Sequence, residues 1–177
     1  MEEKRRKTGT EIIDDVPWGT HICQFYQTKE DLLDILVPYF KAGLENNESC
    51  MWITSPPLTK EIAESALRKA VPDLDRYLKE NRLAILPYSQ WHLRGTDFNA
   101  QRVLHGWSEK IEHALAQGFE GLRISGDTSW VEKENWKAFT DYEATANNAI
   151  PKHRFLALCT YWLEQCSVGA TLNQINK

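Results

Sequence analysis

Residues 48–61 of the chain read ESCMWITSPPLTKE, which is the order of a turn, a short apolar strand, a loop and the first turn of a helix. In a nucleotide-hydrolysing α/β protein, such a loop is rich in glycine and ends in Gly-Lys-Ser or Gly-Lys-Thr, because its backbone N–H groups and its lysine hold phosphates. Here the loop carries Pro56 and Pro57, which have no N–H to donate, and it has no glycine. The stretch therefore predicts the frame of a P-loop protein without its phosphate-binding loop.

Apolar strands and amphipathic helical segments alternate outward from this stretch. Strands are predicted at residues 21–26, 50–54, 83–86, 121–126 and 154–161. Between them lie helical patterns, the longest over residues 98–117 with Gly118 as its C-cap, whereas residues 88–97 are expected to form an aromatic loop. A last helix is expected over residues 163–173. This alternation predicts a three-layer α/β fold, with a mainly parallel sheet of five or more strands and helices on both faces.

The length and the charge of the chain limit the classes of protein to which it can belong. At 177 residues one domain is the default, and the net charge of −4 argues against a nucleic-acid surface. A basic cluster at residues 4–7 falls in a polar N-terminal stretch, and we expect residues 1–17 to be a solvated tail and residues 18–177 to form the domain.

No segment of the sequence has the pattern of a membrane span or of a signal peptide, because no run approaches roughly 18 apolar residues and the N-terminus has no apolar stretch. Four cysteines occur without a Cys-x-x-Cys pair, and we expect them to be free thiols. These features predict a cytoplasmic protein that does not contact a membrane.

In parallel sheets the ligand crevice lies beyond the carboxyl ends of the strands. The predicted ligand-binding residues are those that follow these ends: Tyr26, Ser55, Tyr88, Trp91, Asp127, Trp130 and Tyr161. The aromatic side chains would form an apolar wall beside Ser55 and Asp127, which is typical of small-molecule sites. Packing without a ligand is the alternative for each ring, and capping of the following loop is the alternative for Asp127.

Two further groups of residues could carry chemistry or charge. His21 and Cys23 share one face of the first strand, and if the last strand is its neighbour, Cys159 would meet them in a zinc site. Redox sensing by the thiol of Cys23 or of Cys159 is a further possibility. The alternative is buried thiols with a structural role, and the sequence predicts no metal, no cofactor and no catalytic residue. Arg123 interrupts an apolar strand, where it would pair with Glu143 or Asp141 or face a ligand anion.

Five segments of the chain resemble the MEDS family, the sensory domain of methanogens and methylotrophs: residues 19–26 (GTHICQFY), 38–44 (PYFKAGL), 118–127 (GFEGLRISGD), 142–143 (YE) and 158–161 (LCTY). The resemblance extends from about residue 18 to residue 173. It implies a RecA-like or KaiC-like core that has lost its P-loop. It also implies an N-terminal position in a longer protein with PAS, histidine kinase or DNA-binding modules, and it supplies no catalytic residues.

The sequence and this resemblance together favour a non-catalytic sensory domain of a signal-transduction protein. Its expected ligand is a small C1 or hydrocarbon-derived metabolite, and its expected partner is a downstream PAS, kinase or transcription-regulator module. Two alternatives stay open at this point. One is a degenerate, ATPase-related nucleotide-binding domain, and the other is a dimerisation module that forms a homodimer.

Overall fold

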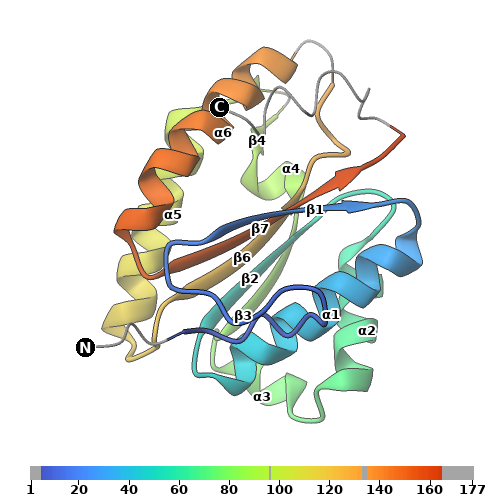
Figure 1. Ribbon diagram of the computed structural model, residues 1–177, viewed down its shortest axis with the longest axis vertical. Coiled ribbons are helices and arrows are strands. Elements are labelled where there is room, and N and C mark those ends of the chain that lie inside the picture. Colours follow the sequence, from blue (N-terminus) through green and yellow to red (C-terminus); the bar gives the residue numbers. More distant parts are fainter. Residues whose placement is uncertain (1–4, 96, 133–134, 165–177) are drawn as a thin grey trace.

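The computed structural model describes residues 5–95, 97–132 and 135–164. Its centre is a sheet of five parallel strands in the order β1-β7-β6-β2-β3 (Figure 1). The strands are β1 (His21–Tyr26), β2 (Ser49–Thr54), β3 (Leu83–Pro87), β6 (Leu122–Asp127) and β7 (Phe155–Trp162). All four pairings are parallel, which confirms the fold class that the alternating pattern predicts.

Helices cover both faces of this sheet, as Figure 1 shows. One face packs against α1 (Lys29–Glu45), α2 (Lys60–Ala70) and α3 (Leu74–Lys79). The other face packs against α5 (Ala100–Ala116) and α6 (Trp136–Ala149), and the 3-10 turn η2 (Ile150–Lys152) links α6 to β7. Among the described residues, no helix is long and apolar enough to cross a bilayer.

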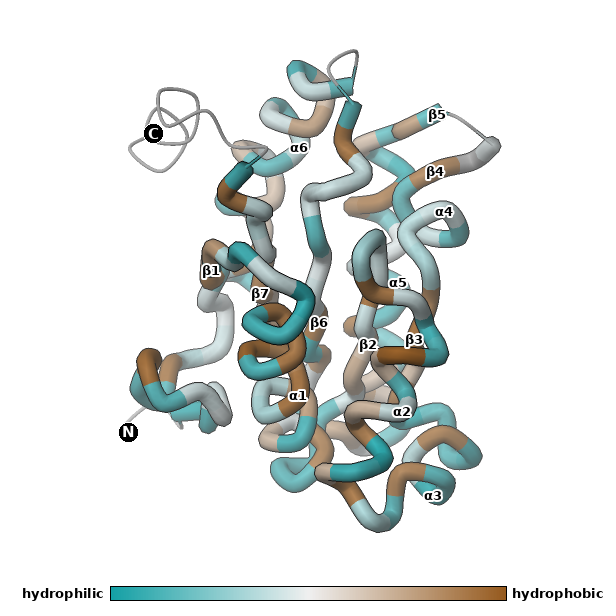
Figure 2. The backbone as a smooth tube through the Cα atoms, turned by 90° about the vertical axis from the view of Figure 1, so that its right-hand side faces the viewer, coloured by the Kyte–Doolittle hydropathy of each residue, from teal (hydrophilic) through white to brown (hydrophobic). Residues whose placement is uncertain are grey.

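The strands separate two hydrophobic cores, because successive side chains of a strand point to opposite faces. Along β2, Cys50 and Trp52 enter the core beneath α1 and α2, and Met51 and Ile53 enter the core beneath α5 and α6. Both sets are buried, so this central strand is apolar at every core position rather than alternating with polar residues. Hydrophobic residues recur along β2, β3, β6 and β7 in Figure 2.

Local sequence signals set the ends of the two longest helices. Thr28 and Asp31 form a reciprocal capping box at the start of α1, in which each side chain accepts a hydrogen bond from the other residue's backbone N–H. Gly118 follows α5 at a φ of +83°, and Phe119 donates its backbone N–H to the carbonyl of Ala114. This pattern is the Schellman motif, and it confirms the predicted helix end.

Two stretches differ from the expected elements. The loop expected over residues 88–97 is replaced by the short helix α4 (Tyr88–Trp91) and by antiparallel strands β4 (Leu93–Arg94) and β5 (Asp97–Phe98), the last of which extends one residue beyond it. Strands of two residues are too short to show a hydrophobic period in the sequence. The helix expected over residues 163–173 lies almost wholly outside the described residues.

The N-terminal segment is packed against the domain, which corrects the expectation of a solvated tail. Arg6 and Thr8 are each 2% exposed, and Arg6 pairs with Val16 in an isolated antiparallel bridge. The Arg6 guanidinium lies 2.8 Å from the Glu48 carboxylate, which accepts a second hydrogen bond of 2.6 Å from Arg123.

Arg123 therefore makes a structural ion pair, but neither of the expected partners on α6 takes part. The Glu48 carboxylate takes their place, because Arg123 points to the α1 face of the sheet and α6 lies on the opposite face. Its other guanidinium nitrogens donate to the carbonyls of Tyr39 and Lys7. These contacts tie the N-terminal segment to α1 and to β6.

Candidate functional site

The topology of the sheet defines one switch point, between β2 and β6. The connection after β2 runs through α2 on one face to β3, whereas the connection after β6 runs through α6 on the other face to β7. The two chain segments thus leave the sheet in opposite directions, which opens the place where ligands bind in proteins of this architecture. Ser55 and Asp127 follow β2 and end β6, so the structure places both at this switch point.

The polar groups at the switch point are bonded to one another. The Asp127 carboxylate accepts hydrogen bonds from the Ser55 hydroxyl at 2.8 Å, the Thr160 hydroxyl at 2.9 Å and the Ser129 backbone N–H at 2.9 Å. Asp127 is 5% exposed. These bonds connect the ends of β2, β6 and β7. They give Asp127 a capping role, which is the alternative to ligand contact that the sequence left open.

An aromatic cluster lies beside these polar groups. Trp130 stacks on Tyr88 at a centroid distance of 5.7 Å and on His92 at 4.9 Å. Burial, followed by the nearby Arg102 charge, lowers the pKa of His92 to about 3, so this imidazole is neutral. Within the described part of the chain, His92 Nδ1 and Trp130 Nε1 are buried without a hydrogen-bond partner.

The other predicted aromatic residues point elsewhere. Trp91 packs on Trp107 of α5 at 4.5 Å. Tyr26 is buried in the core beneath α1, and Tyr161 lies on the opposite face, where its hydroxyl donates to the Glu143 carboxylate at 3.4 Å. The predicted ligand-binding residues thus fall into separate places rather than one crevice, and ligand contact by any of them stays a prediction.

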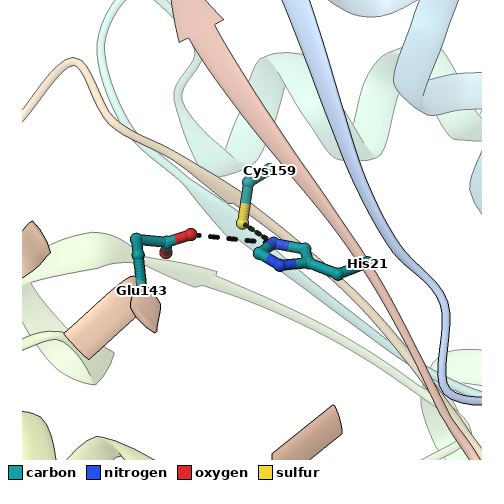
Figure 3. A group of neighbouring side chains, drawn as sticks. All are labelled: His21, Glu143 and Cys159. Atoms are coloured by element: carbon teal, nitrogen blue, oxygen red, sulfur yellow. Dashed lines mark hydrogen bonds and ion pairs between the residues drawn. The ribbon is translucent and has the colours of Figure 1, made fainter. Parts of the chain in front are cut away.

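A cavity of about 110 Å³ lies between α5, α6 and the sheet. Its apolar wall includes residues from all three layers: Trp107, Ile111, Ile124, Tyr142, Ala146 and Ala157. The wall also carries a polar group of three side chains, His21, Glu143 and Cys159, which come from β1, α6 and β7 (Figure 3).

The Cys159 and Glu143 side chains both point to the imidazole of His21 (Figure 3). His21 Nε2 lies 3.1 Å from Cys159 Sγ and 3.7 Å from a Glu143 carboxylate oxygen. The other ring nitrogen, Nδ1, bonds to the side-chain oxygen of Asn147. The His21 and Glu143 side chains are only 9% and 15% exposed.

The surroundings of this group disfavour negative charge. Burial raises the pKa of the Glu143 carboxyl, against the opposing effect of His21. Burial and then the Glu143 carboxylate raise the pKa of the Cys159 thiol well above its ordinary value. A redox-reactive cysteine needs the reverse, a lowered pKa and an accessible thiolate, so this environment gives no support to thiol redox sensing by Cys159.

The sequence predicts that His21 and Cys159 lie close together on paired strands, but it does not identify Glu143 as the third member of the group. Cys23 is the register partner of Cys159, yet it is exposed and lies outside the group. Glu143 takes its place. Its position, four residues after Phe139 and three before Ala146, puts a carboxylate beside the buried stripe of α6, and that was the available signal.

The order of the strands and the two helix layers define an α/β protein of the RecA-like class. The structure is similar to a KaiC-like protein from Pyrococcus horikoshii OT3, with a TM-score of 0.60 and 17% identity over 90% of this chain and 71% of that one. It is also similar to the flagellar accessory protein FlaH from Methanocaldococcus jannaschii, with a TM-score of 0.55 and 11% identity over 93% of this chain and 70% of that one.

The family model described as "MEthanogen/methylotroph, DcmR Sensory domain" matches residues 20–175, and the chain belongs to this MEDS family. A curated relative is the transcriptional repressor DcmR of Methylorubrum extorquens (strain DSM 6343 / CIP 106787 / DM4). It is 26% identical over 151 residues, which cover 83% of this chain and 53% of the repressor. The chain thus spans about half the length of the repressor.

Proposed function

We propose that this chain is a non-catalytic sensory domain that binds a small, weakly polar molecule in the cavity between α5, α6 and the sheet. The observation that carries this proposal is the cavity itself, with its apolar wall and the polar group of His21, Glu143 and Cys159. Small-molecule sites combine these same features, a mostly hydrophobic lining and a few placed polar groups. The sensory family and the regulatory relative support the assignment.

The volume of the cavity limits the size of the ligand. An apolar protein cavity of about 150 Å³ holds one benzene molecule, so a cavity of about 110 Å³ suits a molecule of fewer heavy atoms. A halogenated or methylated one-carbon compound fits this limit. The apolar wall favours its uncharged part, and the His21, Glu143 and Cys159 side chains offer it polar contacts.

The aromatic cluster at the switch point is a second candidate for the ligand site. The buried His92 Nδ1 and Trp130 Nε1, which lack partners within the described residues, favour it. Against it stand the polar neighbours Ser55 and Asp127, which already satisfy each other. We therefore place the ligand in the cavity and treat the cluster as the site to exclude by experiment.

Nucleotide binding is the alternative function that the RecA-like fold suggests. The chain contains no Gly-Lys pair anywhere in its sequence, and Asp127 accepts its hydrogen bonds from the protein itself. A P-loop enzyme needs the lysine of a Gly-Lys pair to bind phosphate, and it needs an acidic residue after a strand to hold Mg²⁺. A thermal shift caused by millimolar Mg-ATP would favour this alternative over the sensory proposal.

A ligand in the cavity would act through α6. This helix supplies Tyr142, Glu143 and Ala146 to the wall and continues through η2 into β7. A ligand can transmit a signal only if it binds one conformation of the protein better than another. We propose that α6 changes its position when the ligand binds. A DNA-binding, PAS or kinase module in the cytoplasm would respond to this change.

The test is a thermal-shift measurement with halogenated and methylated one-carbon compounds. A ligand present at one hundred times its Kd should stabilise the protein by about 2.7 kcal/mol. Ala146→Leu fills the cavity and should abolish the shift. Ala144→Leu makes the same change on the exposed side of α6 and should keep it.

Two outcomes would contradict this placement. A shift that survives in Ala146→Leu but is lost in His92→Phe would move the ligand to the aromatic cluster. The absence of any shift across the panel in the wild-type chain would remove the support for small-molecule sensing.

A further inference from the structure

The His21, Glu143 and Cys159 side chains offer one nitrogen, one oxygen and one sulfur to a common point. These three ligand atoms all lie within 4.8 Å of one another, although the residues come from β1, α6 and β7 (Figure 3). Imidazole, carboxylate and thiolate are the ligands that zinc takes from proteins. The strands and the helix therefore assemble a complete three-residue donor set from distant parts of the chain.

We propose that this group binds one divalent metal ion of the zinc type, held by His21 Nε2, Cys159 Sγ and a Glu143 carboxylate oxygen. Three protein ligands leave the fourth tetrahedral position open, as in zinc sites that bind a water or a small molecule. Because the three side chains line the cavity, we expect that open position to face the cavity. The metal would thus contact whatever the cavity holds.

The two distances from His21 Nε2 lie close to those of a tetrahedral metal site. Tetrahedral ligands at zinc bond lengths lie about 3.4–3.6 Å from one another. The distance from His21 Nε2 to Cys159 Sγ is 3.1 Å, and that from His21 Nε2 to Glu143 Oε2 is 3.7 Å. Small side-chain rotations would bring these two pairs of atoms to the distances of a metal-bound site.

The neighbouring side chains orient the group as they would around a metal. A metal-binding histidine usually donates its other ring N–H to an oxygen, which fixes the tautomer and turns the free nitrogen to the ion. The Asn147 side-chain oxygen accepts from His21 Nδ1 in this way, and that bond directs the Nε2 lone pair toward Cys159 and Glu143. The Tyr161 hydroxyl donates to the Glu143 carboxylate and holds it in place.

Charge balance also favours a divalent ion. A neutral imidazole, a thiolate and a carboxylate carry two negative charges together, which a divalent cation neutralises in this largely buried wall. The metal proposal rests on the same cavity as the proposed sensory function. Its test needs no small molecule, so the two can fail separately.

The experiment uses the whole 177-residue chain, freed of metal with a chelator and then titrated with Zn²⁺ and with Co²⁺. We expect one equivalent of either ion to bind. Bound Co²⁺ should show a thiolate-to-cobalt charge-transfer band and the visible absorption of tetrahedral cobalt. Cys159→Ser should lose the charge-transfer band, and Glu143→Gln, which keeps the side-chain shape, should weaken Zn²⁺ binding by about 100-fold or more.

Matched variants separate this site from other residues that could bind metal. Asn147→Ala should weaken Zn²⁺ binding by roughly 10- to 100-fold, as for residues that orient a metal ligand. His105→Gln removes an exposed His–Glu pair of 3.5 Å on α5 and should leave the affinity unchanged. Cys23→Ser should keep the charge-transfer band.

Circular dichroism spectra of each variant verify that it is folded. A band that persists in folded Cys159→Ser, or Zn²⁺ affinity that is lost in His105→Gln, would assign the metal to another site. The absence of a bound equivalent in the wild-type chain would show that His21, Glu143 and Cys159 form a hydrogen-bonded group only. A one-carbon ligand that shifts the melting temperature of the metal-free protein would leave the sensory proposal intact in either case.

Discussion

His92 shows how a single buried residue links stability to pH. It stacks on Trp130 and is 4% exposed, so the folded protein holds a neutral imidazole whose pKa is lowered to about 3 by burial and then by Arg102. The unfolded chain, with an ordinary histidine pKa of about 6.5, binds the proton more readily. Between these two pKa values the unfolded state binds more protons, so stability rises with pH.

We therefore expect His92 to lower the free energy of unfolding as the pH falls from 6.5 toward the folded pKa. The loss should be up to about 1.4 kcal/mol for each pH unit. His92→Phe keeps an aromatic ring against Trp130 and should flatten this part of the pH profile. Urea unfolding at pH 4.5, 5.5 and 6.5 measures the effect. The exposed His105→Gln variant should keep the wild-type slope, and an equal slope in His92→Phe would contradict the assignment.

Some site residues could be located from the sequence, and others could not. Ser55 and Asp127 follow apolar strands, and the rule that ligands bind at the carboxyl ends of parallel strands located both. Tyr26 and Tyr161 follow the same rule, but they point to opposite faces, because the direction of a side chain depends on its register in the strand. Glu143 was missed because its partners are brought to it only by the tertiary fold.

At the scale of elements, the contact between the N-terminal segment and α1 depends on a glycine. Gly9 has a φ of +81°, and a Cβ atom built on it would lie 2.2 Å from the carbonyl oxygen of Pro38 in α1. Gly118 has nearly the same φ, +83°, but nothing lies within 4 Å of a Cβ atom there. Substitution of Gly118 therefore tests backbone strain alone, whereas substitution of Gly9 tests backbone strain together with a steric clash.

We expect Gly118→Ala to cost about 1–2 kcal/mol of stability, from the left-handed conformation alone. Gly9→Ala should cost at least about 1 kcal/mol more, because the added methyl group cannot fit against Pro38. Thermal unfolding of both variants measures the difference. Equal losses would mean that the N-terminal segment does not pack on α1 as described.

The elements that the sequence predicts well are those with a strong period. The five strands of the sheet and the helix α5 occur within a few residues of their predicted positions, since their apolar residues repeat along one face or run continuously. The hairpin of β4 and β5 could not be predicted, because two residues per strand give no period. The start of α5 at Ala100, two residues later than predicted, shows that helix ends are less certain than helix positions.

At the scale of the whole molecule, an ion-pair network joins the N-terminal segment to the base of the sheet. The Glu48 carboxylate lies between the guanidinium groups of Arg6 and Arg123, and all three side chains are at most 1% exposed. The loss of one partner from a buried ion pair leaves a charge without its counterion, which typically costs 3–5 kcal/mol. The network therefore makes residues 5–17 part of the folded unit.

Deletion of residues 1–17 should thus lower the free energy of unfolding by at least about 3 kcal/mol. Deletion of residues 1–4 leaves Arg6 in place and serves as the control, with wild-type stability expected. Denaturant unfolding of the two shortened chains compares them directly. If the shorter chain that begins at Trp18 is as stable as the control, the N-terminal segment is a dispensable tail.

The parallel topology could be predicted from the alternating pattern, but the docking of the N-terminal segment could not. Right-handed crossovers follow from general rules for strands joined by helices. By contrast, Arg6 and Glu48 lie 42 positions apart, and nothing in a polar stretch of sequence identifies a buried partner at that distance. For that reason the sequence predicts a solvated tail where the structure has a buried ion pair.

The indole of Trp107 forms part of the cavity wall, and its N–H donates to the Tyr142 hydroxyl at 3.0 Å. The protein therefore carries its own fluorophore beside the space that we assign to the ligand. A compound with heavy halogen atoms that entered this space would come close enough to shorten the excited-state lifetime of Trp107. Comparison of wild-type emission with that of a Trp107→Phe chain would let occupancy be followed by light, without a label and in real time.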